Sequence, residues 1–435
     1  MDKLARRVLI FVLLAWVIDA ADSTIYSLTL PAIKDEFGLD LTSMGMLASI
    51  FLAGTVLGAM ILPVVADRLG RRIGICTCVG LFSLATCGVG LASNAAAVAF
   101  GRFFTGCGTG AEWPIGAAYL SEVVPAKRRG WAMGVMQSGY PLGFFLAGFI
   151  FLVTMGWMDL NWRSCYWVLV IPGLALCIPT MTMLRESDAW LQSHGRKDQT
   201  PSLDRPQASR HWCLQLFDAA NRKSTAIATT MHIFGAVYSY GIVVWMPSAL
   251  MIDFGFDKKE VSYFVMLSWA VGTVGYLLAG YFADRAGRKP VLAAYLLIGL
   301  LAVGALNAMH LTGSHNTALL LAIGAMMGVS VGVTVIYITY SSEIYPDQIR
   351  TIGLGFSVAI GKVVAVVVPA ALGAIAEMSS VSAALLVSTM CGVLMLPAIL
   401  CGPETAGRNL GEIAAAVGGP RGDLATQDVA TARRP

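Results

Sequence analysis

Long apolar runs separated by short polar segments are the main pattern of this 435-residue chain. Each run is about 20 residues long, the length that a helix needs to cross about 30 Å of hydrocarbon. The runs lack the alternation of a transmembrane β-strand, and backbone groups inside a bilayer must bond within their own segment, so we expect helices. The twelve expected spans are residues 8–31, 44–66, 73–92, 96–119, 131–155, 164–184, 225–249, 261–283, 290–310, 317–340, 353–375 and 381–402.

Composition supports a membrane protein. Hydrophobic residues make up 57% of the chain and charged residues only 13%, whereas a soluble domain carries about 25% charged residues. Lys3, Arg6 and Arg7 precede the first run, as in a signal peptide, but the run continues to Pro31 with no small-residue cleavage site. We therefore expect it to remain as the first membrane helix.

Two sequence patterns occur once in each half of the chain. ADRLGRR at 66–72 is matched by ADRAGRK at 283–289, and a Tyr-x-Ser-Glu-x-x-Pro-x-x-x-Arg pattern at 119–129 is matched at 340–350. Two echoes at nearly the same offset indicate an internal duplication. We expect an N-terminal six-helix bundle at 1–184, a linker at 185–224, a C-terminal six-helix bundle at 225–402 and a tail at 403–435.

The distribution of Lys and Arg predicts the orientation in the membrane. If the N-terminus is cytoplasmic, 24 of the 30 basic residues fall on the cytoplasmic side, and only four fall on the other side. This asymmetry obeys the positive-inside rule and places both termini in the cytoplasm. It also accounts for the net charge of +4 without a nucleic-acid partner.

Both repeated patterns lie at predicted cytoplasmic turns. In the first pattern, an Asp can pair with basic residues after the turn, and a Gly permits the tight turn itself. We therefore expect a cytoplasmic gate built from corresponding residues of the two halves. Its expected members are Asp67, Arg68, Gly70, Arg71, Glu122, Arg129, Asp284, Arg285, Gly287, Arg288, Glu343 and Arg350.

The first pattern resembles the signature between helices two and three of the major facilitator superfamily, G-x-x-x-D-R-x-G-R-(R/K). The second copy begins at Gly280, whereas the first has Pro63 in that place, so we expect altered packing at that corner. The resemblance implies an all-α membrane protein with the major facilitator fold, twelve transmembrane helices in two bundles. It also implies a central site near the midplane and alternating access by rocking of the bundles.

Further segments resemble particular branches of that superfamily. GRFFTGCGTGAEWPIGA at 101–117 is similar to the fourth-helix signature of proton-linked members, and its GAEWPIGA part to metabolite–proton symporters. PETAGRNLGEI at 403–413 is similar to a tail shared by sugar and organic-acid porters. ESDAWLQSHGR at 186–196 resembles the P-E-S-P-R-W-L stretch of such porters, but Arg185 and Asp188 replace both prolines.

Ionisable residues within the predicted spans are the candidates for proton coupling, because burying them in a bilayer is costly. Asp19 and Asp22 lie three residues apart on one helix face, in an IDAAD segment that resembles the D-G-F-D motif of aromatic-acid and sialate symporters. Arg102 can neutralise either of them, and Glu112 is a further acid in the same span as Arg102. The structural alternatives are an Asp19–Arg102 pair that joins two helices, and a Glu112 that is merely hydrogen-bonded.

Lys362 is the candidate for binding an anionic substrate. It lies about ten residues inside its span, and IGKVVAVVVP resembles a run of helix eleven in organic-acid porters in which a basic residue faces the cavity. The alternative is a lysine that snorkels to the surface. Neutral candidates for the substrate site, which could instead be interface anchors, are Gln137, Tyr140, Tyr238 and Trp245, with Tyr240 and His232 beside them.

These features favour a proton-coupled symporter for a small organic anion, such as an aromatic acid or a sugar acid. The alternatives are a sugar or polyol symporter and, less favoured, a drug or metabolite efflux antiporter. The sequence contains no nucleophile–base constellation, metal-ligand spacing or nucleotide loop, so we expect neither an enzyme nor a cofactor. The expected partners are the anion, protons and the lipid bilayer, and the protein is expected to be a monomer in a bacterial inner membrane.

Overall fold

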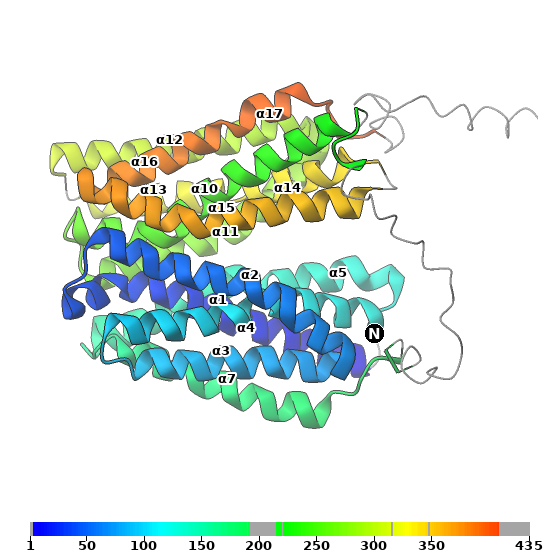
Figure 1. Ribbon diagram of the computed structural model, residues 1–435. Coiled ribbons are helices and arrows are strands. Elements are labelled where there is room, and N and C mark those ends of the chain that lie inside the picture. Colours follow the sequence, from blue (N-terminus) through cyan, green and yellow to red (C-terminus); the bar gives the residue numbers. More distant parts are fainter. Residues whose placement is uncertain are drawn as a thin grey trace, which may run out of the picture.

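The computed structural model describes residues 3–188, 190–191, 215–219, 221–314, 316–346 and 349–408. These residues form long helices that run roughly parallel to one another (Figure 1). In the first half the helices are α1 (Lys3–Phe37), α2 (Leu41–Leu69), α3 (Arg71–Gly90), α4 (Ala95–Val123), α5 (Ala126–Gln137), α6 (Gly139–Phe151), the π-helical turn η1 (Leu152–Trp157) and α7 (Arg163–Met183). In the second half they are α10 (Arg222–Ile252), α11 (Lys258–Ala286), α12 (Arg288–Thr312), α13 (Thr317–Ser330), α14 (Val333–Glu343), α15 (Arg350–Met378), α16 (Val381–Val393) and α17 (Met395–Cys401).

Within the described residues, eleven helical stretches are long and apolar enough to cross a membrane. Some crossings combine shorter helices, such as Trp131–Trp157, Thr317–Glu343 and Val381–Cys401. The one predicted span outside these eleven, 96–119, corresponds to α4, which has 29 residues but carries Arg102 and Glu112 within that span. The prediction of an all-helical membrane protein is therefore confirmed.

Short polar residues set several helix boundaries. Asp40 accepts a hydrogen bond from the Ser43 backbone N–H at 2.6 Å at the start of α2, and Asn94 caps α4 in the same way. Such caps satisfy backbone N–H groups that have no partner within the helix. At the other end of α2, Gly70 has φ 113°, and Gly287 has φ 104° at the corresponding turn between α11 and α12. Residues that have a side chain rarely adopt these φ values, which explains why both turns contain glycine.

Glycines allow α2 and α4 to approach closely. A Cβ atom at Gly54 or Gly58 would overlap the backbone of α4, and one at Gly106 or Gly110 would overlap the backbone of α2. Small residues are the usual means of close helix packing in a membrane. At Gly280, by contrast, no described atom outside its own stretch of α11 lies within 4 Å of a Cβ built there, so this glycine is not required for a close helix contact.

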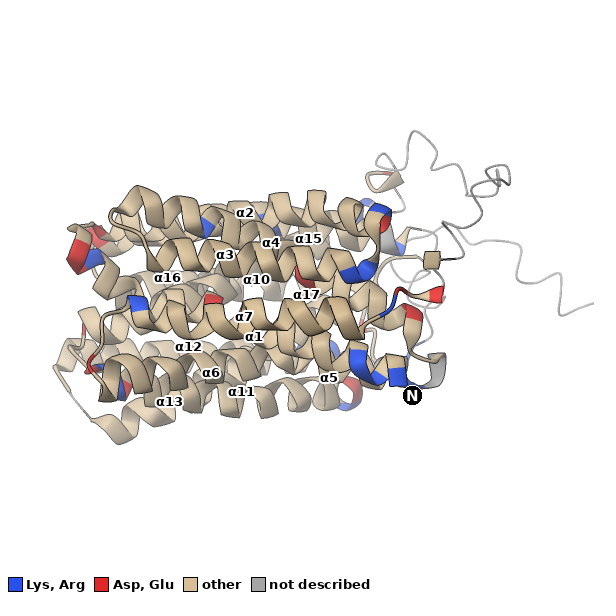
Figure 2. Cartoon of the chain, turned by 90° about the horizontal axis from the view of Figure 1, so that it is seen from below, with Lys and Arg blue, Asp and Glu red and all other residues tan. Residues whose placement is uncertain are grey.

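The two ends of the helix bundle differ in charge. One end, which we call the linker face, contains residues 3–7, the turns at Gly70 and Gly287, and residues 403–408. The other end, which we call the opposite face, contains residues 38–40 and 253–257. Most of the described Lys and Arg residues gather at the linker face, beside the N-terminus (Figure 2). The middle of the bundle is almost free of them.

The two halves of the chain contact each other near the opposite face. Among the described residues, three hydrogen bonds join the halves: Leu41 N–H to Glu377 Oε2 at 2.8 Å, Ala370 N–H to Ser49 Oγ at 3.3 Å, and Lys258 Nζ to Asp159 Oδ1 at 2.9 Å. The last is also an ion pair, and it holds the pKa of the Asp159 carboxyl below its usual value. This conformation is therefore closed at the opposite face.

The first prediction concerns the contacts at this face. The double variant Glu377→Ala with Lys258→Ala should increase severalfold the population of molecules that is open at the opposite face. Each exposed charged contact stabilises the closed face only slightly, but the free energies of independent contacts add. Distances between spin labels on the opposite faces of the two halves would measure this population. Asp35→Ala is the matched control, because among the described residues Asp35 forms an ion pair only with Lys34 of its own helix. Equal distance distributions in all three proteins would show that these contacts do not hold the face closed.

Candidate functional site

Two adjoining pockets lie between the halves of the chain. Their volumes are about 290 Å³ and 450 Å³, and they share lining residues from α1, α5 and α6 on one side and α10 and α15 on the other. The larger pocket continues toward the linker face along α14, where Tyr337 and Thr339 line it. We call the two together the central cavity. The residues common to both pockets are Trp16, Gln137, Tyr140, Tyr240, Val243 and Lys362.

Aromatic side chains form much of the wall of this cavity. Tyr140 stacks on Trp16 with ring centroids 5.6 Å apart, and it also contacts Phe144 at 4.7 Å and Trp269 at 6.0 Å. Tyr240, Tyr276 and Tyr337 contribute from the second half of the chain. Such rings offer flat apolar faces together with phenolic groups that can bond to a ligand.

Of the two cations that line the central cavity, Arg102 is paired with Asp22, whereas Lys362 has no such partner among the described residues. It lies near the middle of α15, is partly buried, and lines both pockets. No carboxylate of the described residues lies within ion-pair distance of its ammonium group. A buried charge without a counter-ion is costly, so this lysine is suited to receive an anion from outside the protein.

Asp19 lies across the same cavity, in the half of the chain opposite Lys362. It lines the smaller pocket, and Thr109 of α4 donates a hydrogen bond to its Oδ1 at 2.5 Å. The described residues supply Asp19 with no ion-pair partner. Asp19 thus faces the cavity with no cation paired to it among the described residues.

Asp22 has a different environment. Its Oδ2 accepts a hydrogen bond from Arg102 Nη1 at 2.9 Å, its Oδ1 accepts one from Thr86 at 2.8 Å, and both charged side chains are only 1% exposed. The Arg102 guanidinium lies between the rings of Tyr26 and Phe51, at 4.3 and 4.2 Å. The ion pair considered above for Asp19 is thus made by Asp22 instead.

The second prediction follows from this buried pair. Asp22→Asn should destabilise the protein by about 3–5 kcal/mol, because it leaves the Arg102 charge buried without a partner. Thermal unfolding of purified protein would measure the loss. Asp19→Asn is the control and should cost less, and Asp22→Asn combined with Arg102→Gln should recover part of the loss. Equal stability of Asp22→Asn and the parent would contradict the assignment.

Glu112 is buried without a polar partner. It is 0% exposed, and neither carboxylate oxygen has a hydrogen-bond partner among the described residues. Gly108 and Gly116 lie one turn before and one turn after Glu112 on α4. A Cβ atom at Gly108 would meet Cys78 and Phe82 of α3, and a Cβ atom at Gly116 would meet Val12 of α1. Glu112 therefore lies between helices rather than in the central cavity, and the hydrogen-bonded acid considered as its alternative is not what the structure contains.

The neutral candidates divide into two groups. Gln137 and Tyr140 line the central cavity, where Gln137 Oε1 accepts a hydrogen bond from Trp113 Nε1 at 2.8 Å. Tyr238 and Trp245 line neither pocket: Tyr238 is buried and donates to Ser330 Oγ at 2.8 Å, and Trp245 donates to the Pro369 carbonyl at 3.3 Å. These two therefore lie outside the central cavity, whereas Tyr240 of α10 lines it.

The first half of the predicted gate forms a cluster at the linker face. Arg71 pairs with Asp67 one turn earlier and with Glu122 of α4 at 3.1 Å. Glu186, which follows α7, accepts a hydrogen bond from the Arg71 backbone N–H at 2.7 Å, and Ser187 donates to Glu122.

The second half repeats this cluster. Arg288 pairs with Asp284 at 2.5 Å and with Glu343 of α14 at 2.9 Å. Glu404 accepts from the Arg288 backbone N–H at 2.8 Å, and Thr405 donates to Glu343 at 2.6 Å. A carboxylate thus caps the N-terminus of α3 and of α12 in the same manner, where the helix dipole favours negative charge.

The remaining gate residues lie around these clusters. Arg68 is exposed, Arg285 lies over the Tyr281 ring at 3.9 Å, and Arg350 donates to the Tyr345 carbonyl at 3.2 Å. The side chain of Arg129 lies outside what the structure describes. Glu186 and Glu404 were not predicted as gate residues. The sequence does contain a repeat that could have indicated them, because an acidic residue is followed by a hydroxyl residue at 186–187 and again at 404–405.

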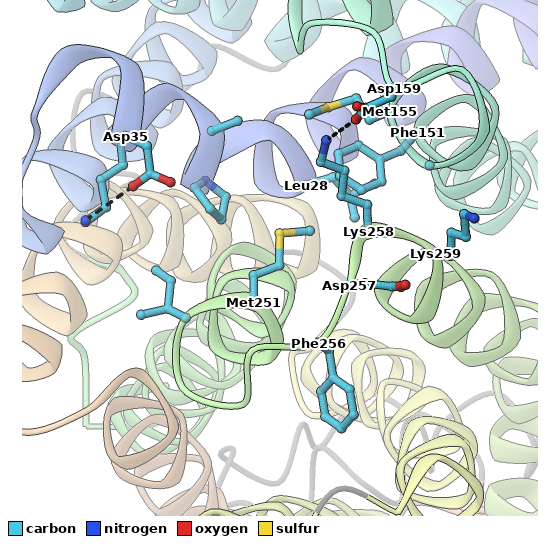
Figure 3. Close-up of a pocket in the computed structure, with 15 residues that line it drawn as sticks. Leu28, Asp35, Phe151, Met155, Asp159, Met251, Phe256, Asp257, Lys258 and Lys259 are labelled. Atoms are coloured by element: carbon cyan, nitrogen blue, oxygen red, sulfur yellow. Dashed lines mark hydrogen bonds and ion pairs between the residues drawn. The ribbon is translucent and has the colours of Figure 1, made fainter.

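A further pocket of about 650 Å³ lies between the halves at the opposite face (Figure 3). Lys258 reaches across it to Asp159, and Lys259 and Asp257 lie at its rim. Its charged side chains are largely exposed, unlike those of the central cavity. Within the described ranges, no group of three His, Cys, Asp or Glu residues could hold a metal ion.

Comparison with known proteins agrees with this architecture. The sequence matches the Major Facilitator Superfamily over residues 12–312 and again over 227–422. It is 29% identical to the cis,cis-muconate transport protein of Acinetobacter baylyi, covering 88% of this chain and 92% of that protein. It is also 29% identical to the 3-(3-hydroxy-phenyl)propionate transporter of Escherichia coli and 27% identical to the benzoate transport protein of A. baylyi, each over 83% of this chain and at least 82% of the other.

Solved structures share the fold. The inward open conformation of the xylose transporter XylE from E. coli superposes with a TM-score of 0.76 at 19% identity, covering 94% of this chain and 99% of that one. At this identity the likeness concerns the fold alone. Because the family match extends over more than half of the chain, the protein belongs to the major facilitator superfamily and is a multi-pass membrane transporter rather than an enzyme.

Proposed function

We propose that this transporter is a proton-coupled symporter that imports a small organic anion, with an aromatic or otherwise unsaturated carboxylate as the favoured substrate. The observation that carries the proposal is Lys362, whose ammonium group has no ion-pair partner among the described residues and lies in a central cavity walled by aromatic rings. A carboxylate would pair with Lys362, and a planar apolar body would lie against Tyr140, Trp16 and Tyr240. The relatives named for muconate, benzoate and hydroxyphenylpropionate transport support the same class.

Proton coupling is assigned to Asp19, with Glu112 as a second proton carrier. Asp19 lines the central cavity, whereas Glu112 is buried beside it with no cation or hydrogen-bond donor. An ionised carboxylate is costly in either place, and the cost falls when a proton binds. Asp22 and Arg102 hold α1 and α4 together, so their pair transmits the protonation state of α1 to the packing of the bundle.

The linker face is assigned to the cytoplasm, because most basic residues gather there. The Arg71 and Arg288 clusters then form the cytoplasmic gate, and the cavity of this conformation opens toward the cytoplasm. Both termini are cytoplasmic in this arrangement, and the membrane is a bacterial inner membrane.

The third prediction concerns this gate. Asp284→Asn should slow transport severalfold and leave equilibrium substrate binding close to the parent, because Asp284, which pairs with Arg288, lies about two turns along α11 from Tyr276, the nearest α11 residue that lines the central cavity. Initial uptake rates and equilibrium binding, measured on the same preparation, separate the two effects. Asp257→Asn, at the opposite end of α11, is the control. A loss of binding equal to the loss of transport would place Asp284 in the substrate site.

A sugar or polyol symporter is the second candidate, because sugar porters share the PETAGR segment at 403–408 with organic-acid porters and the chain also has a partial ESDAWL match at 186–191. A thermal-shift panel on purified protein decides between the two. Benzoate and cis,cis-muconate should stabilise the protein at concentrations where benzamide, xylose and glucitol do not. Stabilisation by the neutral compounds alone would favour the sugar or polyol symporter.

A further inference from the structure

A groove with two arginines lies on the outer surface of the first half, at the linker face. It runs between the start of α1 and the start of α5, has a volume of about 680 Å³, and is lined by Arg6, Leu9, Ile10, Arg128 and Trp131. We call it the Arg6–Arg128 groove. It is separate from the central cavity and shares no residue with it.

Cationic and apolar groups are arranged in sequence along this groove. Arg6 lies one turn nearer the linker face than Leu9 and Ile10 on α1, and Arg128 likewise precedes Trp131 by three residues on α5. Ile10 is 53% exposed and Trp131 is 62% exposed, so both present apolar surface outward. An exposed tryptophan beside basic residues is typical of the level at which a bilayer passes from hydrocarbon to headgroups.

Within the described residues, neither arginine is neutralised by an acidic side chain. Both side chains are exposed, and no carboxylate of the described part of the chain lies within 4 Å of either guanidinium. A guanidinium presents paired donors that suit a phosphate oxygen. Basic pockets between membrane helices at the headgroup level are suited to anionic lipids.

We propose that the Arg6–Arg128 groove binds the headgroup of an anionic phospholipid, such as phosphatidylglycerol. The phosphodiester lies between the two guanidinium groups, and an acyl chain follows Leu9, Ile10 and Trp131 toward the membrane interior. A soluble anion would use the arginines but not this apolar surface. Because α1 and α5 contact each other within one half of the chain, rocking of the halves leaves the site intact.

Native mass spectrometry of the full-length protein in mild detergent tests the proposal, with titrations of phosphatidylglycerol and of phosphatidylethanolamine. The parent should retain phosphatidylglycerol in preference, and R6Q with R128Q should weaken its binding by about tenfold or more, since each basic residue near a membrane contributes about 1 kcal/mol. R6K with R128K should retain the preference. R222Q with K223Q is the matched control, because it removes two exposed charges from the linker face outside the groove.

Three results would overturn the proposal. Equal binding of the two lipids by the parent would remove the role of lipid charge. Equal losses in R6Q/R128Q and R222Q/K223Q would show a diffuse charge effect instead of a site. Glycerol phosphate that competes as well as the lipid at equal concentration would show that the groove recognises a free anion and not a phospholipid.

Discussion

Replacing Lys362 by alanine should weaken the binding of an organic carboxylate by about tenfold to a hundredfold. Opposite charges about 4 Å apart attract by about 4 kcal/mol at an effective dielectric constant near 20, and desolvation offsets much of this attraction. The net attraction that remains is large because no carboxylate of the described residues lies within ion-pair distance of Lys362. Isothermal titration of benzoate or muconate into parent and variant would measure the change.

Lys362→Arg is the matched control for charge. It should retain much of the affinity, because the positive charge stays and the guanidinium can bond to both oxygens of a carboxylate. Benzamide, the neutral analogue of benzoate, should bind the parent poorly and lose little more in Lys362→Ala. If Lys362→Ala binds the carboxylate as tightly as the parent, the main reason for preferring an anion over a sugar disappears.

The second large effect is expected at Asp19. A one-unit pH gradient can drive about tenfold accumulation of a monoanion that moves with one proton, since one pH unit corresponds to 1.36 kcal/mol. Asp19→Asn should reduce this accumulation to the equilibrium level while exchange of labelled for unlabelled substrate continues. The reason is that asparagine keeps the size and a hydrogen bond with Thr109 but cannot take up a proton.

Two further variants complete this test. Glu112→Gln should reduce accumulation in the same direction, because it removes the buried acid without a partner, and Asp35→Asn at the opposite face should leave accumulation unchanged. Exchange and accumulation would be measured in the same proteoliposomes. Tenfold accumulation by both Asp19→Asn and Glu112→Gln would rule out these acids as the proton carriers.

The fold could be predicted in detail from sequence because its main signals are long-range and redundant. The apolar runs predicted the membrane helices, including α4, although its predicted span at 96–119 contains Arg102 and Glu112. The duplicated patterns also predicted Gly70 and Gly287 at equivalent turns, where both have positive φ.

The central cavity was less predictable because it depends on how each helix is rotated. Tyr238 and Tyr240 are two residues apart and so point about 200° apart around α10, and only Tyr240 lines the cavity. A helix that is apolar on all sides gives no sequence signal for which side is inward. The same limit applies to Asp19 and Asp22: their spacing predicted a shared helix face, but not that Arg102 would pair with Asp22 and not with Asp19.

Accumulation of labelled cis,cis-muconate in proteoliposomes tests the central claim most directly. This dianion crosses lipid poorly without a protein, so passive diffusion of the neutral acid contributes little. With an acidic exterior, we expect the parent to concentrate muconate inside, an uncoupler to abolish the accumulation, and Lys362→Ala to show none. Accumulation that persists with the uncoupler, or transport of xylose in place of muconate and benzoate, would contradict a proton-coupled organic-anion symporter.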